Sequence, residues 1–337
     1  MKKVIAILKE YSVVFVLILL GIGFTMGNNA FIKSSNIITI LRQSSILGIA
    51  AMGSMFVIIA GGINLAVGSI VSIVTVIVAL ICVNYGMHWI WGMVIALIVS
   101  VLLGWLTGIS IVKTRISPMI GSLAVKTIIG GIAYIICGGL PVYGIPEASK
   151  ILGQGYLGPI PIPVIIFFIV AAVVSFVLNK TYLGRYFYAS GSNDEAARLS
   201  GINTDKIRIL AYTLSGALAG LAGLVMYGRV GSGQPLAGNE VEMNVLTAVV
   251  IGGVSMAGGE GKVFKACCGV VLISMLTNGL TLMNVGEYPQ MVIRGGIFLG
   301  AVILDSYQHM AVKKKSVSDN KDSNGSNSNK KELAGVK

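Results

Sequence analysis

Charge is scarce in this sequence. Only 11% of the 337 residues are Asp, Glu, Lys or Arg, whereas 55% are apolar; an ordinary soluble domain is roughly 25% charged. A soluble protein with so few charges could not cover its own core, and the surplus apolar surface requires lipid as its solvent. Because apolar runs recur from Tyr11 to Asp305, they leave no room for a sizeable soluble catalytic domain.

Side chains that bind metals or carry out catalysis are also few. Both histidines stand at the ends of apolar runs, and the cysteines inside such runs lack metal-ligand spacing. Metalloprotease and nucleophile-elbow motifs are missing, and residues 259–262 lack the outer positions of a phosphate loop. The sequence therefore predicts no catalytic residue, no metal site and no nucleotide site. The four cysteines, which fit small buried apolar residues, are Cys82, Cys137, Cys267 and Cys268.

Ten apolar segments come close to the length of about 20 residues that a transmembrane helix needs. The two with the least regular pattern are 65–85 and 243–257. The sequence therefore predicts an all-α integral membrane protein with about ten transmembrane helices, some of them interrupted, in one membrane domain over residues 1–310. The ten segments are 11–27, 44–61, 65–85, 88–112, 117–137, 161–179, 207–228, 243–257, 263–283 and 289–306.

The distribution of Lys and Arg predicts the orientation, because cytoplasmic loops carry an excess of both. With the N-terminus inside, 19 of the 25 Lys and Arg residues lie on the cytoplasmic side and four in external loops. Both termini are therefore expected in the cytoplasm, and the net charge of +12 follows the topology rather than indicating a nucleic-acid partner. Residues 311–337, rich in Lys, Ser and Asn, are expected to form a disordered cytoplasmic tail. Attraction of 313–315 to anionic membrane lipid is a further interpretation.

Two glycine-rich segments interrupt the apolar runs. Paired glycines weaken a helix by about 1 kcal/mol each relative to Ala, and a polar side chain beside them needs partners away from lipid. A shift of 191 residues lays the first segment, 61–68, on the second, 252–259, which suggests two related halves. Two interpretations stay open: the segments line a transport pathway, or their glycines pack helices closely. The candidate pathway residues are Gly61, Gly62, Asn64, Gly68, Gly252, Gly253, Ser255 and Gly259.

Charged residues within the predicted spans are costly. Lys126 and Arg294 each cost about 2.5–3.5 kcal/mol near the centre of a membrane helix. Asp305 is the one acid that we assign to a span or its border away from the tail. An autonomous ion-coupled carrier usually needs buried carboxylates, so their scarcity argues against that class.

The longest predicted cytoplasmic loop before the tail covers residues 179–206. Either Ser192 or Asn193 can cap a short helix in this loop, two acidic residues then favour its N-terminal dipole, and Gly201 can end it. A short helix outside the bilayer between two spans is a contact element; a plain connecting turn is the alternative.

Four segments together resemble the permease subunits of bacterial ABC importers for ribose and other simple sugars. The family's GGIDLSVGS-like segment matches residues 61–69, and its cytoplasmic GRxxYAxGxNxxAAxLSGIN segment matches 184–203. Its SxQPxxG and LGGxSxxGGxG segments match 232–238 and 251–261. Their order and spacing agree, and the similarity covers roughly residues 40–306.

Two positions depart from that pattern. Asn64 stands where sugar permeases commonly have Asp, and Ala66 stands where they have Ser. Branched-chain amino-acid permeases, which belong to the same broader group, more often have the Asn form. The departure bears on the solute rather than on the family.

The resemblance implies a multi-pass subunit of the bacterial cytoplasmic membrane that pairs with a second copy or a paralogue. It also implies an ABC ATPase, which would bind ATP and Mg so that this chain carries no cofactor, and an extracellular or periplasmic sugar-binding protein. A sugar or similar small polar solute is the expected cargo; the alternatives are a branched-chain amino-acid or nucleoside permease, an autonomous carrier and a non-transporting scaffold. Segment 184–203 would hold the helix that couples to the ATPase. Its candidate coupling residues are Asn193, Glu195, Ala196, Ala197, Leu199, Ser200 and Gly201.

Overall fold

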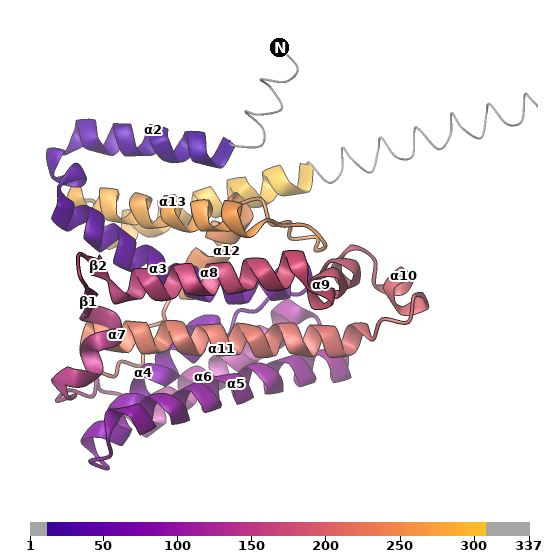
Figure 1. Cartoon of the computed structure of the whole chain (residues 1–337), viewed down its shortest axis with the longest axis horizontal. Coiled ribbons are helices and arrows are strands. Elements are labelled where there is room, and N and C mark those ends of the chain that lie inside the picture. Colours follow the sequence, from indigo (N-terminus) through magenta and orange to yellow (C-terminus); the bar gives the residue numbers. More distant parts are fainter. Residues whose placement is uncertain (1–11, 308–337) are drawn as a thin grey trace, which may run out of the picture.

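The computed structural model describes residues 12–307. The predicted tail, 311–337, lies outside the described residues. The long helices run side by side in one bundle (Figure 1). One end of the bundle carries the short helix α10 (Asp194–Leu199), and we call it the α10 end. The opposite end carries the antiparallel pair β1 (Tyr156–Leu157) and β2 (Ile160–Pro161), and we call it the hairpin end.

Every predicted span overlaps a helix of the structure. Within residues 12–307, the helices α3, α5, α6, α8, α11 and α13 are long and apolar enough to cross a membrane, six in all. A last helix covers residues 287–307. These helices confirm an all-α membrane protein. The order along the chain is α2 (Ser12–Gly27), η1 (Asn29–Ile32), α3 (Ser34–Ile59), α4 (Val67–Val83), α5 (Trp89–Thr114), α6 (Pro118–Ile136), η2 (Glu147–Lys150), α7 (Ile151–Gln154), α8 (Ile162–Lys180), α9 (Tyr182–Ser192), α10, α11 (Thr204–Val230), α12 (Val241–Ile251) and α13 (Val263–Leu282).

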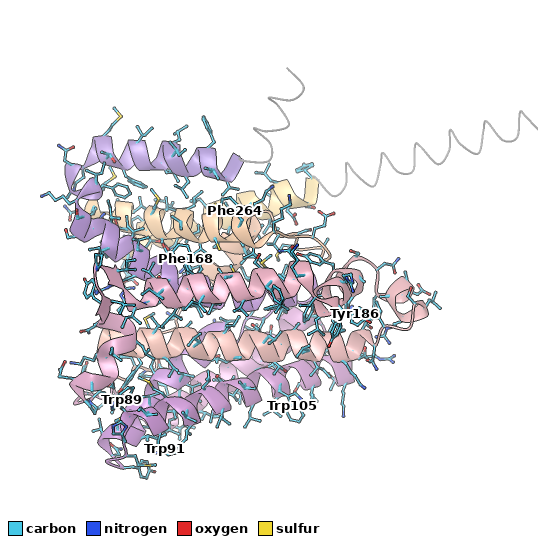
Figure 2. All side chains as sticks on the ribbon, in the orientation of Figure 1. Trp89, Trp91, Trp105, Phe168, Tyr186 and Phe264 are labelled. Atoms are coloured by element: carbon cyan, nitrogen blue, oxygen red, sulfur yellow. The ribbon has the colours of Figure 1, made fainter. Side chains whose placement is uncertain are left out.

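The outside of the bundle is apolar (Figure 2). Large side chains from three different helices face outward: Trp105 is 45% exposed, Phe168 is 64% exposed and Phe264 is 65% exposed. A continuous apolar surface of this kind is unfavourable in water and suits the hydrocarbon core of a bilayer.

Helix α11 lies at the centre and packs against α3, α4 and α5. Glycines let α11 approach α5 closely: a Cβ atom on Gly104 would lie 2.6 Å from the carbonyl oxygen of Tyr212 and 2.8 Å from the Cα atom of Gly216. Because lipid gives helices no hydrophobic reason to associate, such small residues at the contact supply the close packing instead.

Two apolar helices in the interior of the described chain, α4 and α12, are too short to cross a bilayer alone. α4 has 17 residues and α12 has 11, so at 1.5 Å per residue they extend about 25 Å and about 16 Å, against a hydrocarbon core of about 30 Å. Each follows an irregular segment, 60–66 before α4 and 231–240 before α12. The predicted interruption at 61–68 therefore coincides with the irregular segment before α4. The second predicted interruption, 252–259, instead lies after α12, and the irregular segment before α12 was not predicted.

The N-terminal ends of α4 and α12 meet inside the bundle. A Cβ atom on Gly68 would collide with the Glu242 carboxylate and the Gly238 carbonyl oxygen. From this meeting point α4 runs toward the hairpin end, where Trp89 opens α5 (Figure 2). α12 runs the opposite way, and the turn that follows it reaches the end of α3. The two shortened helices thus point in opposite directions from one place.

Candidate functional site

Helix α10 is a capped, well-defined helix rather than a plain turn. The Oδ1 atom of Asn193 accepts a hydrogen bond from the Ala196 amide at 3.0 Å, so Asn193 and not Ser192 is the cap. Gly201 has a left-handed φ of 83°, and its amide donates to the carbonyl of Arg198 at 2.9 Å. Only glycine adopts this conformation without strain, so the predicted end of the helix is confirmed.

The predicted coupling residues divide into two groups. Leu199 is 85% exposed at the tip of the bundle, and the surface around it is formed by Glu195, Ala196 and Ser200, which are also exposed. Ala197 is only 5% exposed and faces the protein itself. We define the α10 surface as Glu195, Ala196, Leu199 and Ser200.

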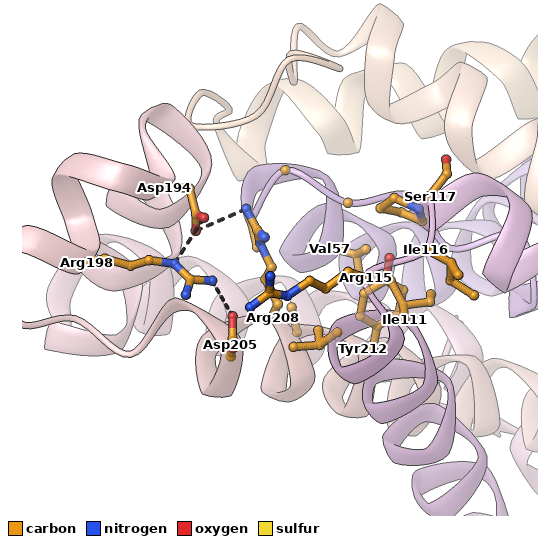
Figure 3. A pocket seen from close by; sticks show the side chains of 16 residues that line it. Val57, Ile111, Arg115, Ile116, Ser117, Asp194, Arg198, Asp205, Arg208 and Tyr212 are labelled. Atoms are coloured by element: carbon orange, nitrogen blue, oxygen red, sulfur yellow. Dashed lines mark hydrogen bonds and ion pairs between the residues drawn. The ribbon is translucent and has the colours of Figure 1, made fainter.

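Ion pairs tie α10 to the beginning of α11 (Figure 3). Arg198 Nε lies 3.1 Å from Asp194 Oδ2, and Arg198 Nη2 contacts Asp205 Oδ1. Arg208 Nη2 lies 3.2 Å from Asp194 Oδ1. Burial acts to raise the pKa of the Asp194 carboxyl, but the nearby Thr204 hydroxyl and the charges of Arg208 and Arg198 outweigh it and hold that pKa below its ordinary value. The network links α10 to the first turns of α11.

A cavity of about 580 Å³ opens between this network and the turn joining α5 to α6 (Figure 3). Gly61 and Gly62 line it on one side, and Arg115 and Ser117 line it on the other. Two of the candidate pathway residues therefore face a cavity at the α10 end.

Asn64 has a different role. Its side chain is 2% exposed; its Nδ2 atom donates to Ser215 Oγ at 3.1 Å and its Oδ1 atom accepts from the Ala66 amide at 3.0 Å. Tyr212 also donates to the carbonyl of Ile63 at 3.1 Å. The amide predicted to need partners away from lipid finds them on α11, where it holds the irregular segment 60–66 in place.

The two glycine pairs both end helices in the same way. The amide of Gly61 donates to the Ile58 carbonyl at 2.9 Å, and the amide of Gly253 donates to the Val250 carbonyl at 2.8 Å. Both glycines have left-handed φ angles, 80° and 75°, which is the geometry of a Schellman helix end. The equivalent residues are 192 positions apart, one more than the shift read from the sequence.

The second glycine-rich segment, 252–259, packs against neighbours at the α10 end. The Gly259 amide donates to the Ile59 carbonyl at 2.9 Å, and a Cβ atom on Gly252 would lie 2.6 Å from the Cα atom of Ala266. Ser255 Oγ lies 3.5 Å from Asp305 Oδ2. These contacts agree with the close-packing interpretation, and a role in lining a pathway stays a prediction.

Two ion pairs at the meeting point of α4 and α12 were not predicted. Lys126 of α6 contacts Glu242 of α12, whose side chain is only 4% exposed, and Arg294 lies 3.0 Å from Glu240. The expectation that Asp305 is the one acid at a span was wrong, because α12 begins at Val241 and takes Glu242 into the bundle. The signal was present: two costly cations needed partners, and two acids lie directly before the span predicted at 243–257.

A second cavity, of about 490 Å³, lies beside the Lys126–Glu242 pair. Its wall is built by the first turns of α4, by one face of α6 and by segment 231–240. Gly68 lines it, so a third candidate pathway residue also faces a cavity.

The comparisons with known proteins agree on one family. Residues 36–302 match the family described as branched-chain amino acid transport system / permease component. The ribose import permease of Haemophilus influenzae is 36% identical over 89% of this chain and 94% of its own length. That of Bacillus subtilis is 35% identical over 86% and 90%, and the D-allose transport permease of Escherichia coli is 33% identical over 88% and 91%. No solved structure matches the chain significantly. The chain therefore belongs to this family of transport-system permease components.

Proposed function

We propose that the chain is the transmembrane permease subunit of an ABC importer that carries a sugar or a similar small polar solute across the bacterial cytoplasmic membrane by alternating access. The observation that carries this proposal is the α10 surface, a rigid exposed helix tip at one end of a bundle from a permease family. The names of the relatives, which cover ribose, D-allose and L-arabinose transport, support a sugar.

The topology that we propose has ten membrane helices with the α10 end in the cytoplasm. Helices α4 and α12 each cross part of the bilayer, and the irregular segments 60–66 and 231–240 complete the two crossings. The start of α2 and the end of the last helix both point toward the α10 side of the bundle (Figure 1), which supports both termini on one side. The excess of Lys and Arg in the loops predicted to be cytoplasmic supports that side being the inside.

The partners follow from the two ends of the bundle. The α10 surface is the docking site for the ABC ATPase, which binds ATP and Mg, so the permease itself supplies no catalytic group. The hairpin end faces outward and receives solute from an extracellular binding protein. A second copy or a paralogue completes the pore.

Reconstitution tests this proposal. The chain is placed in proteoliposomes with its ATPase and its binding protein, and uptake of labelled D-ribose, D-allose and L-arabinose is measured with and without ATP. The ATP is supplied inside or outside the vesicles, on the side on which the ATPase lies. We expect ATP-dependent uptake that needs all three components. Ion-driven uptake by this chain alone would make it a secondary carrier instead.

The description of the matching family, which names branched-chain amino acid transport, favours a second candidate, an amino-acid importer. Labelled leucine and a labelled nucleoside are therefore included as probes. ATP-dependent uptake of leucine, with no uptake of the three sugars, would assign the chain to that candidate.

A further inference from the structure

One face of α6 is polar although α6 lies on the outside of the chain. Thr127, Gly130 and Tyr134 follow at intervals of three and four residues, and Lys126 stands four residues before Gly130, which places the four along one side of the helix. Thr127 is exposed and the Lys126 side chain is 34% exposed. The Thr127 hydroxyl donates to the Leu123 carbonyl at 3.1 Å and is therefore satisfied within the helix. Hydrocarbon would make the partly exposed Lys126 ammonium costly at this depth, which favours water or another polar surface beside this face over lipid.

The cavity of about 490 Å³ lies against this face, and its volume is within the range of about 300–1,000 Å³ that small-molecule sites have. The ammonium and the amide can donate hydrogen bonds to a polyhydroxylated solute. The Ser69 and Thr127 hydroxyls, which already donate to the carbonyls of Ala66 and Leu123, can accept hydrogen bonds from it, and the aromatic ring can cover an apolar face of it. The residues that supply these groups are Ser69, Ser72, Lys126, Thr127, Tyr134 and Asn239.

The charge balance of the cavity favours a neutral solute. The Lys126 ammonium, its one charged lining group, is neutralised by Glu242 immediately behind it. An anionic solute would have to compete with a carboxylate that is only 4% exposed, at the desolvation cost of breaking a buried pair. Among the described residues the second oxygen, Glu242 Oε2, has no hydrogen-bond partner, and it lies against Gly68 at the cavity wall.

We propose that this cavity is a solute-binding site midway through the permease, and that it takes a neutral polyhydroxylated molecule such as a monosaccharide. The proposal rests on the proposed function, which supplies the import, and adds the place where the solute contacts this chain. The α4 and α12 ends that meet beside the cavity give it access from both directions as the bundle changes shape.

Two glycines allow a clean test. Gly131 lines the cavity, and no heavy atom of the described residues lies within 4 Å of a Cβ atom placed there. Gly300, in the last helix, has equally open surroundings. The variants Gly131→Ala, Gly131→Val and Gly131→Leu fill the cavity step by step, and the same three substitutions at Gly300 are the matched control.

The assay is ATP-dependent uptake of labelled D-ribose, D-allose and L-arabinose in proteoliposomes with the ATPase and the binding protein. We expect uptake of the transported sugar to fall with side-chain size at Gly131, by about tenfold or more for Leu, a change of about 1.4 kcal/mol at the transport step. Co-purification of the ATPase and ATPase stimulation by the binding protein should stay unchanged, as should uptake by the Gly300 variants.

Different failures point to different errors. Absence of ATP-dependent uptake of all three sugars by the unmodified complex would overturn the proposed function itself. Normal uptake by Gly131→Leu, with the unmodified complex active, would overturn only the solute site. Loss of the permease dimer on crosslinking in the Gly131 variants would also overturn it, because the polar face would then be an interface with the second copy. Should Gly131→Leu not assemble, Thr127→Val keeps the test open: an unchanged KM for uptake would contradict the proposal.

Discussion

The pair formed by Lys126 and Glu242 gives a prediction whose size follows from burial. The variant Lys126→Met removes the partner of a carboxylate that is 4% exposed. Breaking a buried ion pair from one side costs about 3–5 kcal/mol. Because the Lys126 side chain is 34% exposed and sits at the cavity, water reaches the site, and we expect a cost just below that range, about 2–3 kcal/mol.

Neutralising Glu242 instead of Lys126 should lower the free energy of unfolding by less. Glu242→Gln leaves an ammonium that borders the cavity and can be hydrated there, so we expect about 1–2 kcal/mol. In the double variant Lys126→Met/Glu242→Gln the buried charge is gone, and the double variant should regain most of the stability lost in Lys126→Met. A double variant more stable than Lys126→Met gives a coupling energy whose sign distinguishes a charge effect from a packing effect.

The assay is the free energy of unfolding in mild detergent, measured by titration with a denaturing detergent. Lys113→Met, at an exposed position near the end of α5, is the control for the loss of one lysine. The reasoning is refuted if Lys126→Met is no less stable than Lys113→Met, or if the double variant is as unstable as Lys126→Met.

Three further predictions concern α10 and the meeting point of the short helices. Leu199→Asp should abolish co-purification with the ATPase while leaving membrane insertion intact, since Leu199 is 85% exposed; Ala197→Asp, at a buried site, should instead lower the yield of folded protein. Gly68→Ala should also lower that yield, because the added Cβ atom collides with a carboxylate and a backbone carbonyl, whereas Gly300→Ala should not. The Asp194 carboxyl has a lowered pKa, so its stabilisation of α10 is present above the ordinary value of 3.8 and is lost as pH falls through the lowered pKa. Hydrogen exchange of the α10 amides, corrected for intrinsic rates, should therefore accelerate at acid pH, and Asp194→Asn should remove that pH dependence.

Local signals predicted the parts of the structure that local physics decides. The cap at Asn193 and the end at Gly201 depend on residues within one turn of the helix. The sequence predicted the end at Gly201 and narrowed the cap to Ser192 or Asn193. The start of α3 shows where local signals end. The span was predicted from 44, but α3 begins at Ser34, because a polar first part is stabilised from far along the chain: Arg42 donates to the Gln154 carbonyl at 3.1 Å and lies 4.6 Å from the centre of the Tyr156 ring.

The candidate site was predicted only in part, because its residues are brought together by contacts between distant parts of the chain. The glycines at 61 and 62 could be recognised as a break, but whether they line a cavity depends on where α10 and the α5–α6 turn lie. Asn64 was expected among pathway residues, and its Ser215 partner is 151 positions away. Glu242 was missed because an apolar window excludes a charged first residue, whereas a helix N-terminus accommodates one.

One continuous stretch of chain connects the two cavities. Residues 60–68 carry Gly61 and Gly62 into the cavity at the α10 end and Gly68 into the cavity beside Lys126. That stretch is bound to the middle of α11 through the Asn64 contact with Ser215 and the Tyr212 contact with Ile63. A displacement of α10 by a docked partner would act on the first turns of α11 through the ion pairs. α11 lines the first cavity and binds residues 60–68, which reach the second cavity at Gly68. Because one stretch of chain borders both cavities, we expect linked rather than independent changes at the two, which is the requirement of alternating access.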